Sequence, residues 1–355
     1  MGTAVGSKVY VVCSRWYVVR TLSVLLACAL LLSAAAVSAH VPRTASGNDS
    51  IDTALAVSDP LKSWVFYDEV TLSSSVRYYA MDMRAGQRLR LMALTPEGAP
   101  FAPSIAVMGA GVVGGPAVPD GVEMPPEGEG AYVAPGIREG FSYEPFTPAA
   151  YAQTAEVDLV VPLDGLVYVA VFDMEHPGKV ALAVGYEERF TPLEIVRVPL
   201  DAVGIHRWEG WSLLGMLLPM ALGAAAVAWA ALRRICTVRV TTCVVLYTTV
   251  SAAYAGSAVF FAWAALRALR SSGWDPLFLV SLLFAALPAA LAALAFRRGM
   301  RCGVSPRRGD RAALAALGAA GLAVWAGWVV VPLVALAGSV LPPSVLGRTL
   351  LERGG

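Results

Sequence analysis

The chain has 355 residues, of which 57% are hydrophobic and 15% are charged, and its formal net charge is +1. An average soluble domain has about 25% charged residues, and the mean hydropathy of this chain is +0.62. This composition excludes a soluble globular enzyme, a disordered chain and a nucleic-acid-binding protein.

The small net charge conceals an asymmetry between two regions. Residues 40–210 contain 23 acidic and 11 basic residues, a net charge of −12, whereas the rest of the chain contains 3 acidic and 16 basic residues, a net charge of +13. An acidic region is typical of a water-facing domain, and an apolar region with basic connectors is typical of a membrane part. We therefore expect a membrane protein with one large domain outside the membrane.

Residues 1–39 predict an export signal. Three basic residues precede an apolar run at 21–36, and Val37-Ser38-Ala39 is a small-residue cleavage motif. The apolar run is shorter than the roughly 20 residues that a membrane-spanning helix needs. We therefore expect a signal peptide cleaved after Ala39, with an uncleaved signal anchor as the alternative. In both cases the following residues lie outside the cytoplasm.

Residues 40–190 carry apolar residues with a period of two, the spacing of β-strands. Turn residues such as Asp164-Gly165 and Pro177-Gly178 separate the apolar runs. The expected strands are 63–70, 76–83, 87–94, 104–108, 155–162, 166–172 and 179–185. About seven short strands without long helical patterns predict an exported antiparallel β-sandwich. This region contains no cysteine, so core packing has to hold it together, and its length permits this.

A long loop at 109–153 interrupts the strand pattern. It is rich in Pro, Gly and Glu and far exceeds the usual connection of about 4–6 residues. Its acidic residues favour a basic partner surface, and its aromatic residues are suited to anchoring one. The candidate partner-binding residues are Tyr132, Phe141, Tyr143, Glu144 and Phe146. The alternatives are a mobile surface insertion, or a loop that Tyr143 and Phe146 pin onto the sandwich.

Residues 191–211 alternate apolar and charged residues and are interrupted by Pro199. This pattern predicts an amphipathic juxtamembrane stalk that joins the sandwich to the membrane part. We expect the stalk to share the partner-docking surface with the loop at 109–153.

Four later segments are long and apolar enough to cross a bilayer and contain no Asp, Glu, Lys, Arg or His. They are 212–232, 241–266, 276–296 and 312–338. Arginines are concentrated in the connectors after the first and third segments, which the positive-inside rule places in the cytoplasm. The sequence therefore predicts a four-helix transmembrane bundle in the plasma membrane, with an extracytoplasmic sandwich and an extracytoplasmic tail at 340–355.

The spans and the exported domain offer no catalytic pattern. Ionisable residues that a proton relay or pump needs are absent from the spans, and the chain has no Gly-x-Ser-x-Gly elbow. We expect a non-enzymatic multi-pass envelope protein, without a cofactor, whose acidic sandwich binds a partner or ligand. The expected partners are the lipid bilayer and a protein at the extracytoplasmic face, with no nucleic acid. The competing hypothesis is a small transporter, or transporter subunit, with the sandwich as receptor domain.

Three smaller features suggest local chemistry. After cleavage, His40 would carry a free α-amino group and, together with His176, could hold Cu(II); coincidence is the alternative. Asn48-Asp49-Ser50 is a glycosylation sequon, a motif that also occurs by chance. Tyr247, Ser251 and Tyr254 place three hydroxyls on one helix face. Such a face either bonds to neighbouring helices or lines a polar passage.

The five cysteines are Cys13, Cys28, Cys236, Cys243 and Cys302. They lie in the signal, the spans or the connectors, and their spacing is not that of metal ligands.

Two sets of residues resemble known families. The run Asn48-Asp49-Ser50-Ile51-Asp52-Thr53-Ala54, followed by Trp64, Tyr78-Tyr79 and Ala85-Gly86-Gln87-Arg88-Leu89, resembles the opening of a pre-peptidase C-terminal type sandwich. Four further blocks resemble an uncharacterised family of archaeal, mostly methanogen, membrane proteins. They are His40-Val41-Pro42, Asp59-Pro60-Leu61-Lys62-Ser63-Trp64, Ser142-Tyr143-Glu144-Pro145-Phe146-Thr147-Pro148 and Ile205-His206-Arg207-Trp208-Glu209-Gly210. This resemblance implies a signal, a sandwich and a helical bundle, and no activity.

Overall fold

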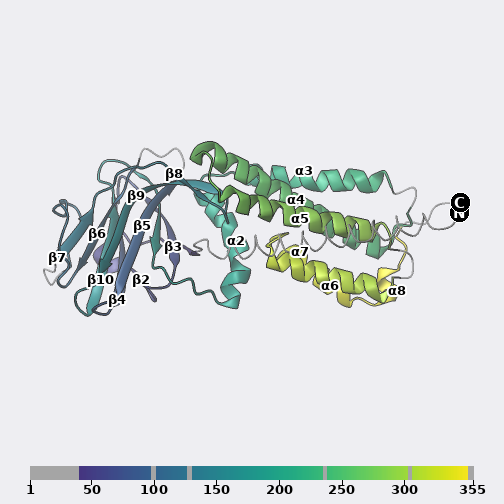
Figure 1. Cartoon of the computed structure of the whole chain (residues 1–355), viewed down its shortest axis with the longest axis horizontal. Coiled ribbons are helices and arrows are strands. Elements are labelled where there is room, and N and C mark those ends of the chain that lie inside the picture. The colour runs from purple at the N-terminus through teal and green to yellow at the C-terminus, as the bar shows by residue number, and fades with distance from the viewer. Residues whose placement is uncertain (1–39, 97–100, 126–129, 235–237, 303–305, 351–355) are drawn as a thin grey trace, which may run out of the picture. The chain divides into compact units, whose positions relative to one another are not determined.

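The computed structural model describes residues 40–96, 101–125, 130–234, 238–302 and 306–350. The expected signal at 1–39 lies outside the described residues. From His40 onward, a strand-rich region is followed by helices (Figure 1). We call residues 40–190 the β-domain and residues 212–350 the helical part.

The described residues of the β-domain form eleven strands in two sheets. One sheet has the order β1-β3-β11-β5-β9-β8, and the other has the order β2-β4-β10-β6-β7. The strands are β1 (Val41–Thr44), β2 (Leu55–Val57), β3 (Trp64–Val70), β4 (Val76–Met83), β5 (Arg88–Pro96), β6 (Ser104–Gly109), β7 (Gly130–Ala134), β8 (Phe141–Glu144), β9 (Ala149–Val160), β10 (Gly165–Phe172) and β11 (Gly178–Val184).

Alternate side chains of both sheets meet in one core. Met81 of β4 and Val169 of β10, from one sheet, belong to the same buried cluster as Leu91 of β5 and Leu182 of β11, from the other. All four side chains are inaccessible to solvent. The period-two pattern of the sequence corresponds to this alternation, because successive strand residues point to opposite faces of a sheet. All seven expected runs form strands, which confirms a strand-rich domain.

The structure differs from the expected strand set at the edges of the sheets. β1 and β2 are additional strands, and they pair with β3 and β4 in parallel, so the pairing is not wholly antiparallel. β7 and β8 are also additional, and both lie inside the stretch that we expected to be a 45-residue loop, 109–153. These four strands have only three to five residues each. Such short runs between Pro and Gly residues carry too little periodicity to be recognised.

The expected stalk is a helix, α2 (Pro192–Trp208), that lies on the β-domain. It begins with a capping box in which Thr191 and Glu194 each accept a hydrogen bond from the other's backbone N–H. Near its end, Ile205 packs against Tyr67, and the indole nitrogen of Trp208 donates to the Asp68 carbonyl at 2.8 Å. The stalk is therefore attached to the domain at both of its ends, because Glu194 also forms an ion pair with Lys62 at 2.7 Å.

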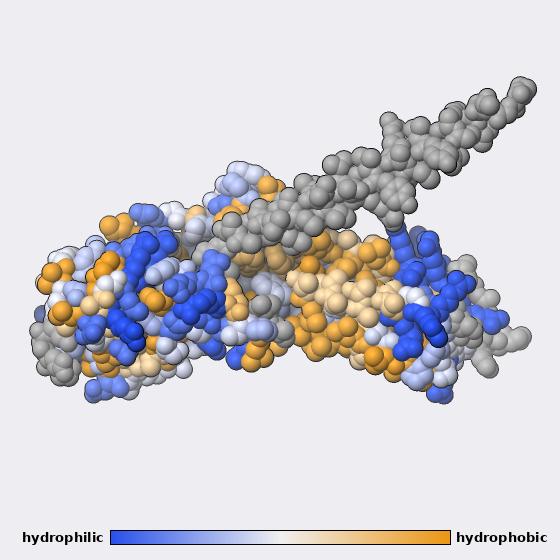
Figure 2. Space-filling model, turned by 60° about the horizontal axis from the view of Figure 1, so that its bottom comes forward, coloured by the Kyte–Doolittle hydropathy of each residue, from blue (hydrophilic) through white to orange (hydrophobic). Residues whose placement is uncertain are grey.

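Within the described residues, three helices are long and apolar enough to cross a membrane. They are α3 (Leu213–Leu232), α4 (Thr242–Ser272) and α5 (Phe278–Gly299). Hydrophobic residues gather over the helical part, and hydrophilic residues cover one end of it (Figure 2). α3 and α4 approach closely at Gly223, where a Cβ atom would lie only 2.4 Å from the Ala255 carbonyl oxygen. These three helices indicate a membrane protein.

The fourth expected span, 312–338, is not one helix. It is divided into α6 (Arg308–Ala323) and α7 (Val330–Val340), which run antiparallel: Arg311 Nε donates to the Ser339 carbonyl at 2.9 Å. Trp325, Trp328 and Val329 in the turn between them have positive φ angles. With 16 and 11 residues, both helices are shorter than the roughly 20 residues that a span needs. The apolar composition is uniform across the turn, so the break left no mark in the hydropathy pattern.

This helical hairpin reverses the course of the chain. After α7, the short α8 (Pro343–Leu346) leads to Thr349, which bridges to Thr241, and Leu350 N–H donates to the Val240 carbonyl at 3.0 Å. Leu350, the last described residue, thus lies beside the arginine-rich connector that precedes α4. Of the expected tail at 340–355, Thr349 and Leu350 lie at the same end of the helices as that connector, because α6 and α7 fold back on each other instead of forming one continuous span.

This reversal predicts a labelling pattern. Single cysteines introduced at Gly309 and Ser344 should react alike with a membrane-impermeant thiol reagent in intact cells, and opposite to a cysteine at Ser73 in the β-domain. Labelling of the parent chain provides the background, because the native cysteines are retained. Reaction of Ser344→Cys together with Ser73→Cys, and not with Gly309→Cys, would contradict the helical hairpin.

Candidate functional site

The turn between β8 and β9 is inserted between the helices. The Tyr143 hydroxyl donates to Ser281 Oγ of α5 at 2.8 Å, and Ser281 donates in turn to the Pro145 carbonyl at 2.7 Å. The Tyr143 ring packs edge-on against Phe278, with 6.1 Å between ring centres. Both Tyr143 and Ser281 are buried. The turn is therefore docked through hydrogen bonds that solvent does not reach.

Phe146 extends this contact to the hairpin of α6 and α7. Its ring lies 5.8 Å from Phe284 of α5 and 6.2 Å from Trp325 in the turn after α6. Phe284 and Trp325 themselves are 5.7 Å apart. Three rings from three distant parts of the sequence thus form one cluster. The β8–β9 turn contacts both a spanning helix and the tip of the helical hairpin.

An acid and a histidine are buried beside this turn. Glu209, just after α2, accepts a hydrogen bond from the Tyr151 hydroxyl of β9, and its Oε2 lies 2.9 Å from His206 Nδ1. The side chains of His206 and Glu209 are only 2% and 6% exposed. The His206 ring packs against Trp211 and Phe260, at 5.1 and 5.3 Å. The end of α2 is thereby joined to β9 and to α4.

Glu144 at the end of β8 completes the group. Its Oε1 accepts from the Phe146 backbone N–H at 3.0 Å, and the surrounding atoms raise its pKa to about 7, chiefly by desolvation and further through the charge of Glu209. Burial also raises the pKa of Tyr151 well above its usual range. We call Glu144, Tyr151, His206 and Glu209 the junction cluster. Of these groups, the Glu144 carboxyl can bind or release a proton near neutral pH.

A small cavity of about 190 Å³ opens beside the junction cluster. Tyr151, Glu209, Trp211 and Arg267 line it, and the Arg267 guanidinium lies over the Trp211 ring, 4.5 Å from its centre. This volume is below the roughly 300–1,000 Å³ of typical ligand pockets. The cavity is suited to a few water molecules or a small polar group.

The structure separates the five candidate partner-binding residues. Tyr143, Glu144 and Phe146 lie at the junction, where the rings of Tyr143 and Phe146 pack against the chain's own helices. Tyr132 on β7 is half-buried against the β-domain core, and Phe141 at the start of β8 lies under the Arg138 guanidinium, at 5.3 Å. Aromatic residues in an acidic stretch can serve an internal interface as well as an external one, and partner binding by these five residues stays a prediction.

The two histidines of the suggested copper site are far apart. His40 is beside the Ser63 hydroxyl at the Trp64 end of β3, and burial, helped by Arg90, lowers its pKa to about 4. His176 is exposed and precedes Gly178, which pairs with the other end of β3. Six strand residues separate these ends by about 20 Å. Among the described residues, no group of three or more His, Cys, Asp or Glu side chains is placed to hold a metal ion.

The suggested glycosylation residue, Asn48, is buried in the β-domain with 1% exposure. Its Nδ2, the atom to which a glycan would be attached, donates to Asp68 Oδ2 at 3.0 Å and to the Tyr78 carbonyl at 3.2 Å. Asp68 also accepts from the Tyr79 hydroxyl and pairs with Arg77 at 3.1 Å. In the folded domain, Asn48 therefore joins two strands and is not accessible for modification.

Sequence reasoning missed two features of the helical part and its boundary. His206 and Glu209 are spaced i, i+3 in the stalk, which places them on one helix face and could have indicated a pair.

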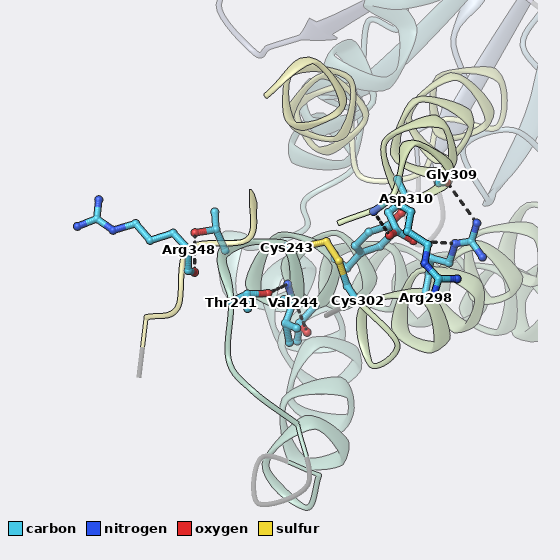
Figure 3. Close-up of a disulfide and its surroundings, with 12 residues drawn as sticks. Thr241, Cys243, Val244, Arg298, Cys302, Gly309, Asp310 and Arg348 are labelled. Carbon is cyan, nitrogen blue, oxygen red and sulfur yellow. Dashed lines mark hydrogen bonds and ion pairs between the residues drawn. A yellow bond between two sulfur atoms is a disulfide. The ribbon is translucent and has the colours of Figure 1, made fainter. Parts of the chain in front are cut away.

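The second feature is a disulfide between Cys243 at the start of α4 and Cys302 just after α5, with 6.3 Å between their Cα atoms (Figure 3). Arg298 and Asp310 form an ion pair nearby, at 3.6 Å. The bases of α4, α5 and α6 are thus tied together.

In comparisons with protein-family models and with curated protein sequences, nothing matches this chain. The family resemblance noted in the sequence therefore stays a prediction. Two of the blocks on which it depends, 142–148 and 205–210, meet at the junction through Glu144 and Glu209.

The raised pKa of Glu144 predicts a pH-dependent stability. Between its ordinary value of 4.5 and about 7, the folded protein binds more protons at this carboxyl than the unfolded chain does. The contribution of Glu144 to the free energy of unfolding is therefore most favourable below pH 4.5, falls as the pH rises to about 7, and stays low above it. The total loss is at most about 3 kcal/mol.

Glu144→Gln keeps the acceptor oxygen and removes this titration. In detergent micelles, the variant should unfold at a higher temperature than the parent at pH 8 and at nearly the same temperature at pH 5. Glu139→Gln, an exposed acid in the preceding loop, is the matched control and should follow the parent at both pH values. If the unfolding temperatures of Glu144→Gln and of the parent differed by the same amount at pH 5 and at pH 8, the assigned pKa would be contradicted.

Proposed function

We propose that this chain is a non-enzymatic multi-pass envelope protein in which an extracytoplasmic β-sandwich receives a partner or ligand and transmits that event to the membrane helices. The insertion of the β8–β9 turn between α5 and the tip of the α6–α7 hairpin is the observation that carries this proposal. A tether would need only a flexible linker and one anchor. A docked domain with buried contacts is suited to coupling.

The coupling path has two parallel arms. One arm is the β8–β9 turn, through Tyr143 to Ser281 and through Phe146 to Trp325. The other is α2, whose Glu209 is bonded to Tyr151 of β9. Because β9 belongs to both arms, a shift of this strand relative to the helices has to break buried contacts in each. Packed interfaces of this kind change between discrete arrangements, which is the physical requirement for a switch.

The hydroxyl face of α4 supports this function over transport. Tyr247 donates to the Asp310 carbonyl at 2.6 Å, Ser251 to the Ala292 carbonyl at 2.8 Å and Tyr254 to the Leu317 carbonyl at 2.9 Å. All three hydroxyls therefore join α4 to neighbouring helices, the more ordinary of the two interpretations of this face. A polar passage would need such groups turned toward water.

The proposed orientation places the arginine-rich connectors in the cytoplasm, in line with the positive-inside rule. The disulfide then lies at the cytoplasmic end, a compartment in which such bonds are rare. Cys243 and Cys302 are 0% and 3% exposed. Thiol–disulfide exchange needs access of a thiolate to the bond, so burial protects it.

This protection can be measured. In the folded protein in detergent micelles, mild reductant followed by an alkylating reagent should leave Cys243 and Cys302 unmodified. After unfolding in a denaturing detergent, the same reductant should release two additional thiols. The number of cysteines alkylated without reductant is the control for the remaining cysteines. Rapid alkylation of the pair in the folded protein would contradict the buried bond.

The coupling itself predicts an effect at a distance. Phe146→Ala should accelerate amide hydrogen exchange in residues 324–329 by about three- to tenfold, because each aromatic contact contributes about 0.5–1.5 kcal/mol. Phe141→Ala, a half-buried aromatic of the same hairpin, is the matched control and should leave this exchange unchanged. Equal exchange in Phe146→Ala and the parent would show that the turn does not hold the helical hairpin.

The binding role of the sandwich is tested separately, by photo-crosslinking in native membranes. Crosslinkers at exposed β-domain positions, Leu72 and Glu139, should form discrete adducts that a crosslinker at the lipid-facing Leu222 does not form. If several exposed β-domain positions give no adduct that is absent from Leu222, the receptor role is wrong, whatever the hydrogen-exchange result.

A further inference from the structure

The cavity of about 190 Å³ beside the junction cluster lies between the β-domain, the stalk and a spanning helix. Its walls come from the end of β5, the start of β9, the turn after α2 and the last turns of α4. Proline and alanine side chains form much of the wall on the β-domain side, and Glu209 and Arg267 are its two charged residues. A ligand in this cavity would therefore touch both arms of the coupling path and α4 at once.

Glu209 and Arg267 line the same cavity without forming an ion pair with each other. Glu209 is hydrogen-bonded to Tyr151 and to His206, and the Arg267 guanidinium lies over the Trp211 ring. Among the residues that the structure describes, no acid forms an ion pair with Arg267, and no lysine or arginine forms one with Glu209. The cavity thus has an acidic and a basic wall that no direct ion pair connects.

Other charges near the cavity have both signs. Lys179 of β11, which lies beside the turn after α2, has Glu69 of β3 as its cross-strand partner. Arg207 in the last turn of α2 and Glu144 at the end of β8 add one further group of each sign. Glu97, which follows β5, lies outside the described residues. The surroundings therefore favour neither a net cation nor a net anion.

The walls also indicate which kind of positive group fits. A primary ammonium has three N–H donors to satisfy. The lining side chains offer oxygen acceptors only at Glu209 and Tyr151, and the Tyr151 hydroxyl already donates to Glu209. A quaternary ammonium needs no hydrogen bond and is attracted by aromatic rings. The rings of Tyr151 and Trp211, together with the prolines and alanines, are suited to its methyl groups.

We propose that this cavity binds a small zwitterion, with a quaternary ammonium group at Glu209 and a carboxylate at Arg267. A guanidinium matches a carboxylate through two parallel hydrogen bonds. A volume of about 190 Å³ equals about six water molecules at roughly 30 Å³ each, which is enough for such a molecule. The proposal names a ligand class for the proposed function and rests on that function only for the transmission of the binding event.

The test measures binding of glycine betaine to the full chain by saturation-transfer NMR, in micelles of an uncharged maltoside detergent. Two probes of nearly the same shape each lack one charge. Choline has a hydroxymethyl group in place of the carboxylate, and 3,3-dimethylbutyrate has a carbon atom in place of the ammonium nitrogen. Each should bind at least about tenfold more weakly than glycine betaine, because contacts between charged groups are stronger than those with neutral ones.

Variants test the two charged walls. Arg267→Gln should weaken glycine betaine binding about tenfold, because the carboxylate loses its charged donor. Arg270→Gln, an exposed arginine on the same helix and outside the cavity wall, is the matched control and should bind like the parent. Glu209→Gln should lose the preference for glycine betaine over 3,3-dimethylbutyrate. Thermal unfolding checks that each variant is folded. If Glu209→Gln does not fold, the exposed Arg267 and the two probes still decide the test.

Three outcomes would overturn the proposal. One is the absence of saturable glycine betaine binding. Another is equal binding of choline or of 3,3-dimethylbutyrate, which would indicate a site for a cation or an anion alone. The third is unchanged binding in folded Arg267→Gln.

Hydrogen exchange separates this site from the proposed function. Saturating glycine betaine should change amide exchange in residues 324–329. Selective binding without such a change would support the site and contradict the transmission to the helices. Absence of binding, with the crosslinked β-domain adducts still formed, would contradict the site alone.

Discussion

The structure depends on how one serine, Ser281, satisfies polar groups inside an apolar surrounding. Its hydroxyl accepts from Tyr143 and donates to the Pro145 carbonyl, and both bonds are buried. A carbonyl left unpaired at this depth would cost roughly 1–3 kcal/mol. The pair of bonds therefore fixes where the β8–β9 turn enters the helices, and the positions of Phe146 and the junction cluster follow from that entry point.

The junction cluster adds a charge constraint to this geometric one. Glu144 and Glu209 lie near each other where water is scarce, and the charge of Glu209 disfavours the ionised form of Glu144. Glu209 has a histidine and a tyrosine as hydrogen-bond partners, whereas Glu144 has backbone N–H groups. The boundary between β-domain and helices is thus sensitive to protonation at a point where both arms of the proposed coupling path meet.

The α6–α7 hairpin connects this boundary with the opposite end of the helical part. Its tip touches Phe146 through Trp325, while its base is held by the bond from Tyr247 to the Asp310 carbonyl and by the ion pair of Asp310 with Arg298. Because the α6–α7 hairpin is held at its tip and at its base, it is suited to passing a displacement of the β8–β9 turn from one end of the helical part to the other. The disulfide lies beside its base, at the start of α4, so a change there would reach it.

The sequence by itself determined the elements whose pattern is long and local. β4 has the expected bounds, 76–83, because eight alternating residues define a strand, and α3 to α5 follow from apolar runs of span length. Only the tertiary structure decided that Tyr143 meets Ser281, 138 residues away, that 324–329 is a turn, and that Asn48 is buried. Hydropathy records whether a side chain avoids water. It does not indicate which surface the buried side chain contacts, because lipid, a second helix and a docked strand are all apolar. Only the assembled fold distinguishes these surfaces.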